Sequence, residues 1–347
     1  MVRRALFGSL AIAPLVVLAH YVLDVDKTVE FVLAAVALVP LAWLIGEATE
    51  HAAEHTGPGI GGFLNATFGN APELIIALLA VNELKFEVVR GSLTGSVIGN
   101  LLLVLGFSLL FGGRGEVDRR SSFVSIGLTA LATILFLVVS IPGWDGDPER
   151  DSLANLAIPV SIVLLLVYIG VTWYSLRRHR AQHVVGEEQV AAGWSLRLAL
   201  VVLGVATVVT ALVAEILVGS IEAFAHDFGV TEFFLAAVVI AIVGNAAEHG
   251  GAVVVAYRGK IALAAEIALA SAAQVAVFLI PAVTLLALLI EPLALSFRQV
   301  EIAMLAGAVV LTSAVLAQGR SSRLRGGILI AGYVAVAFVF FEAGERF

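Results

Sequence analysis

Long apolar runs separated by short polar segments dominate the pattern of this chain. The runs approach or exceed about 20 residues, the length that an α-helix needs to cross the hydrocarbon core of a bilayer. They lack the short alternation of strands in outer-membrane barrels. The pattern therefore predicts an all-α polytopic membrane protein with eleven transmembrane helices. The predicted helices cover residues 4–23, 29–55, 59–81, 88–111, 121–141, 153–176, 195–225, 232–257, 261–290, 299–317 and 326–342.

The composition excludes several classes of protein. Of the 347 residues, 60% are apolar and 14% are charged, whereas soluble domains are about 45–50% apolar and about 25% charged. The chain has no cysteine, which excludes disulfides, thiolate metal sites and a thiol nucleophile. A formal net charge of −7 provides no basic surface for a nucleic-acid partner. The predicted partners are therefore the lipid bilayer and small ions, without a cofactor.

The positions of the basic residues predict the orientation of the helices. Arg3 and Arg4 precede the first run, and no small-residue cleavage pattern follows it, which favours a retained helix over a signal peptide. With the N-terminus inside, most of the 20 lysines and arginines fall in inside segments, as the positive-inside rule requires. The sequence predicts an N-terminus inside and a C-terminus outside. We expect the membrane to be the cytoplasmic membrane of a prokaryote.

An internal repeat relates the two halves of the chain at one constant offset in numbering. The sequence Gly-Asn-Ala-Pro-Glu at 69–73 matches Gly-Asn-Ala-Ala-Glu at 244–248, and the same offset aligns Lys85 with Lys260. Each copy holds five predicted helices, and the odd number places the copies in opposite senses, as in many secondary transporters. The predicted organisation is an N-terminal helix at 1–28, a first repeat at 29–178, a cytoplasmic linker at 179–194 and a second repeat at 195–347.

Two acidic residues, Glu73 and Glu248, fall near the middle of predicted helices. A charge at that depth is costly and indicates a functional site. Asn70 and Asn245 precede them by one helical turn on the same face, and Pro72 loosens the first helix because it lacks an N–H. Loosened backbone can offer carbonyl oxygens to a cation. The predicted ion-binding residues are Glu73, Glu248, Asn70, Asn245, Ala71 and Ala246.

The neighbouring predicted helices, 88–111 and 261–290, combine small and polar residues. Small residues allow close helix packing, and packing alone explains most of this pattern. Ser96, Asn100, Ser271 and Gln274 are supporting candidates, which either reach the central site or face other helices. His249 follows Glu248 about 100° around the helix, so we expect a proton relay or a supporting group there and not a ligand.

The candidate ligands are all oxygen atoms, which suit a hard cation such as Ca²⁺. Two neighbouring carboxyl groups in a low dielectric can hold either protons or one divalent cation, because two bare charges are costly there. Competition between these two loads is a mechanism for antiport. The sequence therefore supports the hypothesis of a cation/proton antiporter in which Glu73 and Glu248 are the metal ligands.

Further acidic residues lie nearer to the ends of predicted helices. Glu47, Glu50 and Glu54 fall on the cytoplasmic half of one helix, and Glu215 and Glu222 on the outer half of another. We interpret them as acidic vestibules that gather cations at the two mouths. The alternative is an ordinary interfacial face without a transport role.

A competing motif occurs at 51–55, where His-Ala-Ala-Glu-His fits the inverted zinc-protease pattern. Two histidines at this spacing could bind Zn²⁺. However, no third ligand is evident, and no soluble catalytic domain surrounds the segment. An intramembrane metalloenzyme is therefore a minor alternative to a transporter.

The two repeat motifs resemble those of the cation/proton exchanger family within the Ca²⁺/cation antiporter superfamily. The resemblance rests on Gly69 to Glu73, on Gly-Asn-Ala-Ala-Glu-His at 244–249, on the segment 95–106, on Ser-Ala-Ala-Gln at 271–274 and on Ala-Thr-Glu at 48–50. It covers about residues 29–342. It implies Ca²⁺/H⁺ exchange by alternating access, exporting Ca²⁺ from the cytoplasm, with Glu73 and Glu248 as the paired acids and no enzymatic activity.

Two positions depart from the family pattern. Pro72 replaces the usual Thr and is similar to the sodium/calcium exchanger branch, and Gly219 stands where members often carry Asp. A sodium-coupled Ca²⁺ exchanger is therefore the alternative. It would need extra acids beside the central pair, where this chain has Ser, Asn and Gln274. A channel is a third interpretation, and a homo-oligomer is left open by the sequence.

Overall fold

The computed structural model describes residues 2–23, 25–145, 147–149, 151–180 and 193–344, and nearly all of them are helical. Within these ranges, eight helices are long and apolar enough to cross a membrane, or nine if the bent pair Glu232–Gly244 and Glu248–Tyr257 is one span. The chain is therefore an integral membrane protein of the all-α class. This count is lower than the predicted eleven spans. It does not exclude eleven, because two shorter apolar helices, Leu6–Val22 and Ala71–Asn82, are not included in it. The predicted linker at 179–194 falls mostly outside the described residues.

The elements follow one another with short connections. The first part of the chain forms α1 (Val2–Ser9), α2 (Ile12–Val22), α3 (Lys27–Phe68), α4 (Ala71–Asn82), α5 (Phe86–Ile98), η1 (Gly99–Val104), α6 (Leu105–Gly112), β1 (Gly115–Glu116), α7 (Arg119–Ser140), η2 (Ile141–Gly143) and α8 (Asp151–Arg180). The second part forms α9 (Leu196–Phe228), α10 (Glu232–Leu235), η3 (Ala236–Ile240), α11 (Ala241–Gly244), α12 (Ala246–Tyr257), α13 (Ile261–Gln274), η4 (Val275–Leu279), α14 (Ile280–Ala287), α15 (Gln299–Leu316), β2 (Arg320–Ser321) and α16 (Arg323–Glu342).

One predicted helix boundary is wrong. The sequence predicted a break between 55 and 59 and a single helix over 59–81, but α3 continues to Phe68 and the chain breaks at Gly69 and Asn70. Membrane helices tolerate glycine and proline where a nearby group satisfies the freed backbone. In this part of the helix the Thr56 hydroxyl donates to the carbonyls of Ala52 and Ala53, whereas Pro58 removes the helical donor of the Glu54 carbonyl. The break therefore lies shortly before Glu73 and not in the segment that the sequence indicated.

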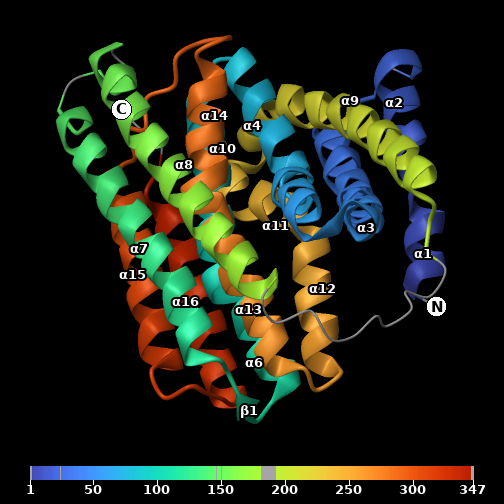
Figure 1. Cartoon of the computed structure of the whole chain (residues 1–347). Helices are drawn as coiled ribbons and strands as arrows, with labels where there is room; N and C mark the ends of the chain where they lie inside the picture. Colours follow the sequence, from blue (N-terminus) through green and yellow to red (C-terminus); the bar gives the residue numbers. More distant parts are fainter. Residues whose placement is uncertain (1, 24, 146, 150, 181–192, 345–347) are drawn as a thin grey trace.

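Two groups of helices flank a central layer (Figure 1). The long helices α3 and α9 lie against each other on one side, and α7, α8, α15 and α16 gather on the other. Between them α5 is buried from Val88 to Ile98. In contrast, α8 exposes large apolar side chains such as Leu166 and Ile169, as expected of a lipid-facing helix. The central layer carries the paired acids.

Close helix packing explains one glycine of the central layer. A Cβ atom built on Gly95 of α5 would lie 2.0 Å from the carbonyl oxygen of Ala237 in η3, so only glycine fits there. This is the small-residue packing that the sequence indicated for the 88–111 helix. The contact brings α5 against the segment that leads into α11 and α12.

Helix boundaries in the two halves follow the constant offset of the sequence repeat. Shifting the bounds of α4 by that offset gives those of α12, and shifting the bounds of α6 gives those of α14. Short π-helical segments, η1 and η4, interrupt the helices α5–α6 and α13–α14 at corresponding places. Because π-helical turns are rare and are often found at functional sites, their recurrence marks these two helices as related in structure as well as in sequence.

Candidate cation site

Two helix breaks place the paired acids at helix N-termini. Asn70 (φ −100°, ψ 19°) and Asn245 (φ −89°, ψ 9°) depart from helical geometry directly before α4 and α12. Pro72 consequently stands at the second position of α4, where its missing N–H costs no hydrogen bond. The loosened helix that the sequence predicted at Pro72 is thus a new helix start.

Glu73 and Glu248 each lie in the first turn of the helix that follows the break. The positive end of the helix dipole favours a negative charge at that place. Glu73 is 6% exposed, and its Cγ would lie 3.1 Å from a Cβ built on Gly244. Its carboxylate and that of Glu248 are close enough to repel each other electrostatically. The fold therefore brings together two acids that belong to opposite halves of the sequence.

A hydrogen-bond network around Asn245 connects the second break to α5. The Asn245 amide nitrogen donates to Ser96 Oγ (2.8 Å) and to the Ala241 carbonyl (2.8 Å). Its Oδ1 accepts from Asn100 Nδ2 (3.3 Å). The supporting candidates Ser96 and Asn100 therefore lie beside the predicted ion-binding residue Asn245, and Asn70 is buried at the other break.

Several buried oxygen atoms in this region have no hydrogen-bond donor among the described residues. They include Oε2 of Glu73, Oε2 of Glu248 and Oδ1 of Asn100. A buried acceptor without a partner is costly, and a cation bound beside such an oxygen would satisfy it. The structure thus offers oxygen ligands from three helices, α4, α12 and the π-helical segment η1.

The remaining candidates on the second half lie around Glu248. Ser271 makes a side-chain hydrogen bond to Glu248. His249 Nε2 is buried without a hydrogen-bond partner among the described residues, and Gln274 is half-buried. Backbone at Ala71 and Ala246 begins the two helices. The part of the chain that the structure describes contains no group of three His, Cys, Asp or Glu that could hold a metal ion, so a cation here would depend on two carboxylates with amide, hydroxyl and backbone oxygens.

The predicted vestibule on α3 contains an ion-paired histidine. His51 lies between Glu47 (3.7 Å) and Glu54 (3.2 Å), while Glu50 is exposed. His55 instead contacts the Trp194 carbonyl at 2.8 Å. The two histidines of the zinc-protease pattern thus have different partners, and they do not form a metal site among the described residues.

The acidic cluster at the α4–α5 loop is larger than the sequence indicated. Lys85 Nζ lies 3.1 Å from Glu232 and 3.5 Å from Glu222. Glu83 interacts electrostatically with Glu215 and Glu232. The sequence predicted Glu215 and Glu222 but not Glu83, Lys85 and Glu232. The alignment of Lys85 with Lys260 in the repeat could have drawn attention to this loop.

Glu83 supplies an acid near Gly219, the position where family members often carry Asp. A Cβ built on Gly219 would lie 3.9 Å from Glu83 Oε1, so an acid from the α4–α5 loop stands opposite the position where the family pattern has Asp. Burial is the main cause that raises the pKa of Glu83, with Lys85 lowering it and the acids Glu215 and Glu232 raising it further. The cluster retains its acidic character through this residue.

A second charged network lies near the same end of α5 and was not predicted from the sequence. The Arg90 side chain is 2% exposed and contacts Glu87 (2.6 Å) and Glu149 (2.5 Å). Nearby, the buried Glu301 accepts from the Arg298 backbone N–H (2.8 Å) and the Thr94 hydroxyl (3.3 Å). These contacts connect α5 to the η2–α8 connection and to α15.

Comparisons with known proteins identify the family of this chain. The family model for sodium/calcium exchanger protein matches residues 27–177 and 198–342. The chain is 38% identical over 325 residues to the Ca²⁺/H⁺ antiporter ChaA of Bacillus subtilis (strain 168), covering 91% of this chain and 92% of that protein. It is 36% identical over 345 residues to the vacuolar cation/proton exchanger 1a of Oryza sativa subsp. japonica, covering 92% and 76%.

Solved structures give the same result. The Ca²⁺/H⁺ antiporter protein YfkE superposes with a TM-score of 0.83 at 33% identity, covering 98% of this chain and 99% of that one. The H⁺/Ca²⁺ exchanger CAX shares the fold, with a TM-score of 0.78 at 14% identity and coverage of 98% and 91%. The chain therefore belongs to the sodium/calcium exchanger protein family, in the cation/proton exchanger group that its two repeat motifs resemble.

Proposed function

We propose that this protein is a Ca²⁺/H⁺ antiporter that exports Ca²⁺ from the cytoplasm by alternating access. One observation carries the proposal: Glu73 and Glu248 stand in the first turns of two helices, interact electrostatically, and each has a buried carboxylate oxygen without a hydrogen-bond partner among the described residues. The names of the relatives, ChaA and the vacuolar exchanger among them, support the choice of Ca²⁺ and H⁺.

The chemistry of the pair explains exchange. Ca²⁺ accepts six to eight oxygen ligands in irregular geometry, and the carboxylates of Glu73 and Glu248, the Asn70 and Asn245 region and water can supply them. When Ca²⁺ leaves, two adjacent bare carboxylates in a low dielectric are costly, so protons replace the cation. The site is nearly neutral when it holds either Ca²⁺ or protons, so the protein can switch the site from one side of the membrane to the other. The empty site carries two negative charges, which oppose that switch. This couples the two fluxes.

We propose an inverted arrangement of two five-helix repeats, 29–178 and 195–347, behind an N-terminal helix at 1–28. The matching bounds of α4 and α12, and of α6 and α14, support it. We further propose that the N-terminus is cytoplasmic and the C-terminus outside, so that the α4–α5 loop faces outside and the α12–α13 loop faces inside. The acids Glu47, Glu50 and Glu54 and the acids Glu215 and Glu222 then gather cations at opposite mouths.

Sodium coupling is the alternative, because Pro72 and the family description both leave it open. A sodium site would require additional charged ligands beside the pair. The side chains next to Asn245 are the neutral Ser96 and Asn100, and Ser271 and Gln274 occupy α13. Neutral neighbours favour protons over several Na⁺ ions as the counter-substrate.

The test is Ca²⁺ flux into proteoliposomes driven separately by a pH gradient and by a Na⁺ gradient. We expect uptake with the pH gradient alone, and loss of that uptake to the background of empty vesicles in Glu73→Gln and in Glu248→Gln. A matched control is Glu266→Gln, which removes an α13 carboxylate bonded to Ser121 away from the pair and should retain transport. Full pH-driven uptake by either site variant would refute the assignment of the site. Uptake driven by the Na⁺ gradient alone would show that Na⁺, and not H⁺, is the counter-substrate.

A further inference from the structure

A pocket lies where two loops meet at the end of the molecule that carries β1. The strands β1 and β2 pair antiparallel, with Gly115 opposite Ser321 and Glu116 opposite Arg320. The Ser321 hydroxyl donates to the carbonyls of Gly113 (2.7 Å) and Gly115 (3.2 Å). These bonds hold the α6–α7 and α15–α16 connections together around a cavity of about 460 Å³, within the range of about 300–1,000 Å³ that is usual for ligand pockets.

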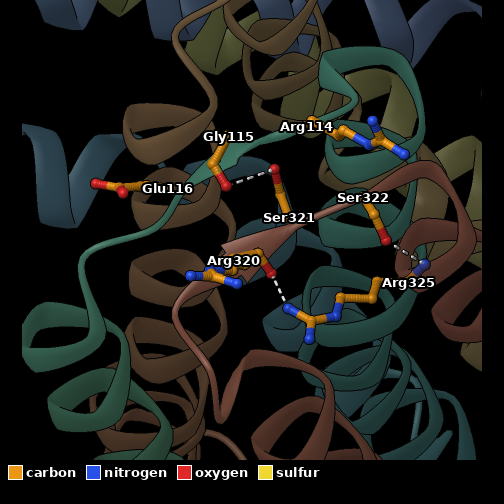
Figure 2. Close-up of a pocket in the computed structure, with 7 residues that line it drawn as sticks. All are labelled: Arg114, Gly115, Glu116, Arg320, Ser321, Ser322 and Arg325. Carbon is orange, nitrogen blue, oxygen red and sulfur yellow. Dashed lines mark hydrogen bonds between the residues drawn. The ribbon is translucent and has the colours of Figure 1, made fainter.

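The pocket is strongly basic. Arg114, Arg320 and Arg325 line it together with one acid, Glu116, so the side chains carry three positive charges and one negative. Figure 2 shows the Glu116 carboxylate directed away from Arg114 and Arg325. Three arginines around one cavity form a site for an anion, because each guanidinium presents a fork of donors that matches phosphate oxygens.

The arginines are not neutralised by acids of the described residues. Arg114 and Arg320 make no side-chain hydrogen bond or ion pair with any described residue, and both are exposed. Arg325 donates to neutral acceptors, the Arg320 carbonyl and Gln318 Oε1 (2.6 Å). Their charge is therefore available to a ligand.

The surroundings place the pocket within reach of lipid. The pocket lies where the apolar helices α6, α7, α15 and α16 end or begin, which is the level of lipid headgroups in a membrane protein. Phe111, three residues before Arg114, is 52% exposed, and Leu324, next to Arg323 and Arg325, is 75% exposed, as expected of side chains that face acyl chains. The phosphate nearest to the pocket is therefore that of a lipid headgroup in the surrounding leaflet.

We propose that this arginine pocket binds a phosphate group, carried by an anionic phospholipid of the leaflet in which β1 and β2 lie. Basic pockets between transmembrane helices suit such headgroups, and each Lys or Arg near the surface contributes about a fivefold gain in affinity. Neither Glu73 nor Glu248 lines the pocket, so the inference is independent of the transport proposal.

The experiment uses the full chain, purified in detergent and stripped of lipid, and counts bound lipids by native mass spectrometry. Phosphatidylglycerol is added to the wild type, to the double variant Arg114→Gln/Arg320→Gln, and to the control Arg120→Gln/Arg258→Gln. The control removes the same charge from exposed arginines outside the pocket. We expect the pocket variant to lose about twentyfold in affinity and the control to stay within about twofold of the wild type.

Two further arms identify the source of the phosphate and report on folding. Phosphatidylcholine should bind no better to the wild type than to the pocket variant, and inorganic phosphate should raise the melting midpoint less than phosphatidylglycerol does. If inorganic phosphate raised the melting midpoint as much as phosphatidylglycerol does, and the pocket variant lost this rise, the pocket would be a phosphate site. Free phosphate, and not a lipid, would then be its ligand. Arg114→Lys/Arg320→Lys retains the charge and should retain most of the binding. Equal lipid binding by wild type and pocket variant, or an equal loss in the control, would overturn the proposal.

Discussion

The helices α5 and α13 correspond in the two halves of the chain, yet their N-terminal ends are held differently. At the start of α5, Lys85 contacts Glu222 and Glu232, and Arg90 is buried among Glu87 and Glu149. The corresponding residues before and in α13 are Lys260, which is exposed and has no ion pair among the described residues, and Ala265, which is buried. The start of α5 is thus connected to its neighbours by ion pairs, whereas Lys260 at the start of α13 makes none among the described residues.

This difference bears on which mouth is closed in the structure. Around the first break, Ala71, Pro72 and Glu73 are all buried, whereas Glu248 and His249 on α12 are half-buried and Gly250 is exposed. Ion pairs connect the α4–α5 end to α9 and α10, while nothing comparable connects Lys260 within the described part of the chain. The comparison teaches that corresponding helices can carry corresponding acids and still bury them to different degrees, while the loops beside them make different contacts.

The largest expected effect comes from removing the buried charge of α5. Arg90→Met removes the buried cation that contacts Glu87 and Glu149, and breaking a buried ion pair costs about 3–5 kcal/mol. We expect a much lower melting midpoint in detergent, measured by thermal unfolding. Arg258→Met is the control, because Arg258 is exposed at the other end and has no ion pair among the described residues. Equal midpoints for the two variants would show that the ends are held alike.

A smaller effect is expected at the Lys85 contacts. Lys85→Met removes both ion pairs, each worth about 0.2–1 kcal/mol at a partly exposed site, so the mouth should open about 2- to 27-fold more often. The chain lacks cysteine, so Ser96→Cys, beside Asn245, gives a single reporter that a water-soluble maleimide can label from the α4–α5 side. Lys260→Met is the matched control and should leave that rate unchanged. The idea fails if both lysine variants label at the wild-type rate.

The smallest effect is the pH dependence contributed by Glu83. Burial is the main cause that raises the pKa of this carboxyl; Lys85 lowers the pKa, and Glu215 and Glu232 raise it further. A raised pKa in the folded state means that the stabilising contribution is present at acid pH and is lost as the pH rises through that pKa. The midpoint of the wild type relative to Glu83→Gln should therefore fall from acid to neutral pH. Glu50→Gln reports the effect of removing an exposed carboxylate at the other mouth, and a constant difference for Glu83→Gln would contradict the expectation.

Much of the central layer could be predicted from the sequence. The cost of a carboxylate in an apolar run singled out Glu73 and Glu248, and the constant offset of the repeat paired them. Ser96 and Asn100 followed from their helix and lie beside Asn245. Polarity at membrane depth is a strong local signal, because few residues violate the apolar pattern.

The helix breaks and the charged contacts could not be predicted in the same way. Gly-Pro-Gly at 57–59 has more helix-breaking residues than Gly69 and Asn70, yet α3 passes through the former and ends before the latter. Lys85 with Glu232, and Arg90 with Glu149, join residues far apart in the sequence. Such pairs depend on which helices become neighbours, and a single sequence carries no local signal for that.

The sequence by itself determined the membrane class, the oxygen chemistry of the site and the pairing of its two acids, because hydropathy and residue type are properties of the chain alone. Only the tertiary structure decided that both acids stand at helix N-termini, that Glu83 lies opposite Gly219, and that arginines from two connections line one pocket. Those features arise from distances between segments, which packing fixes only when the helices have come together.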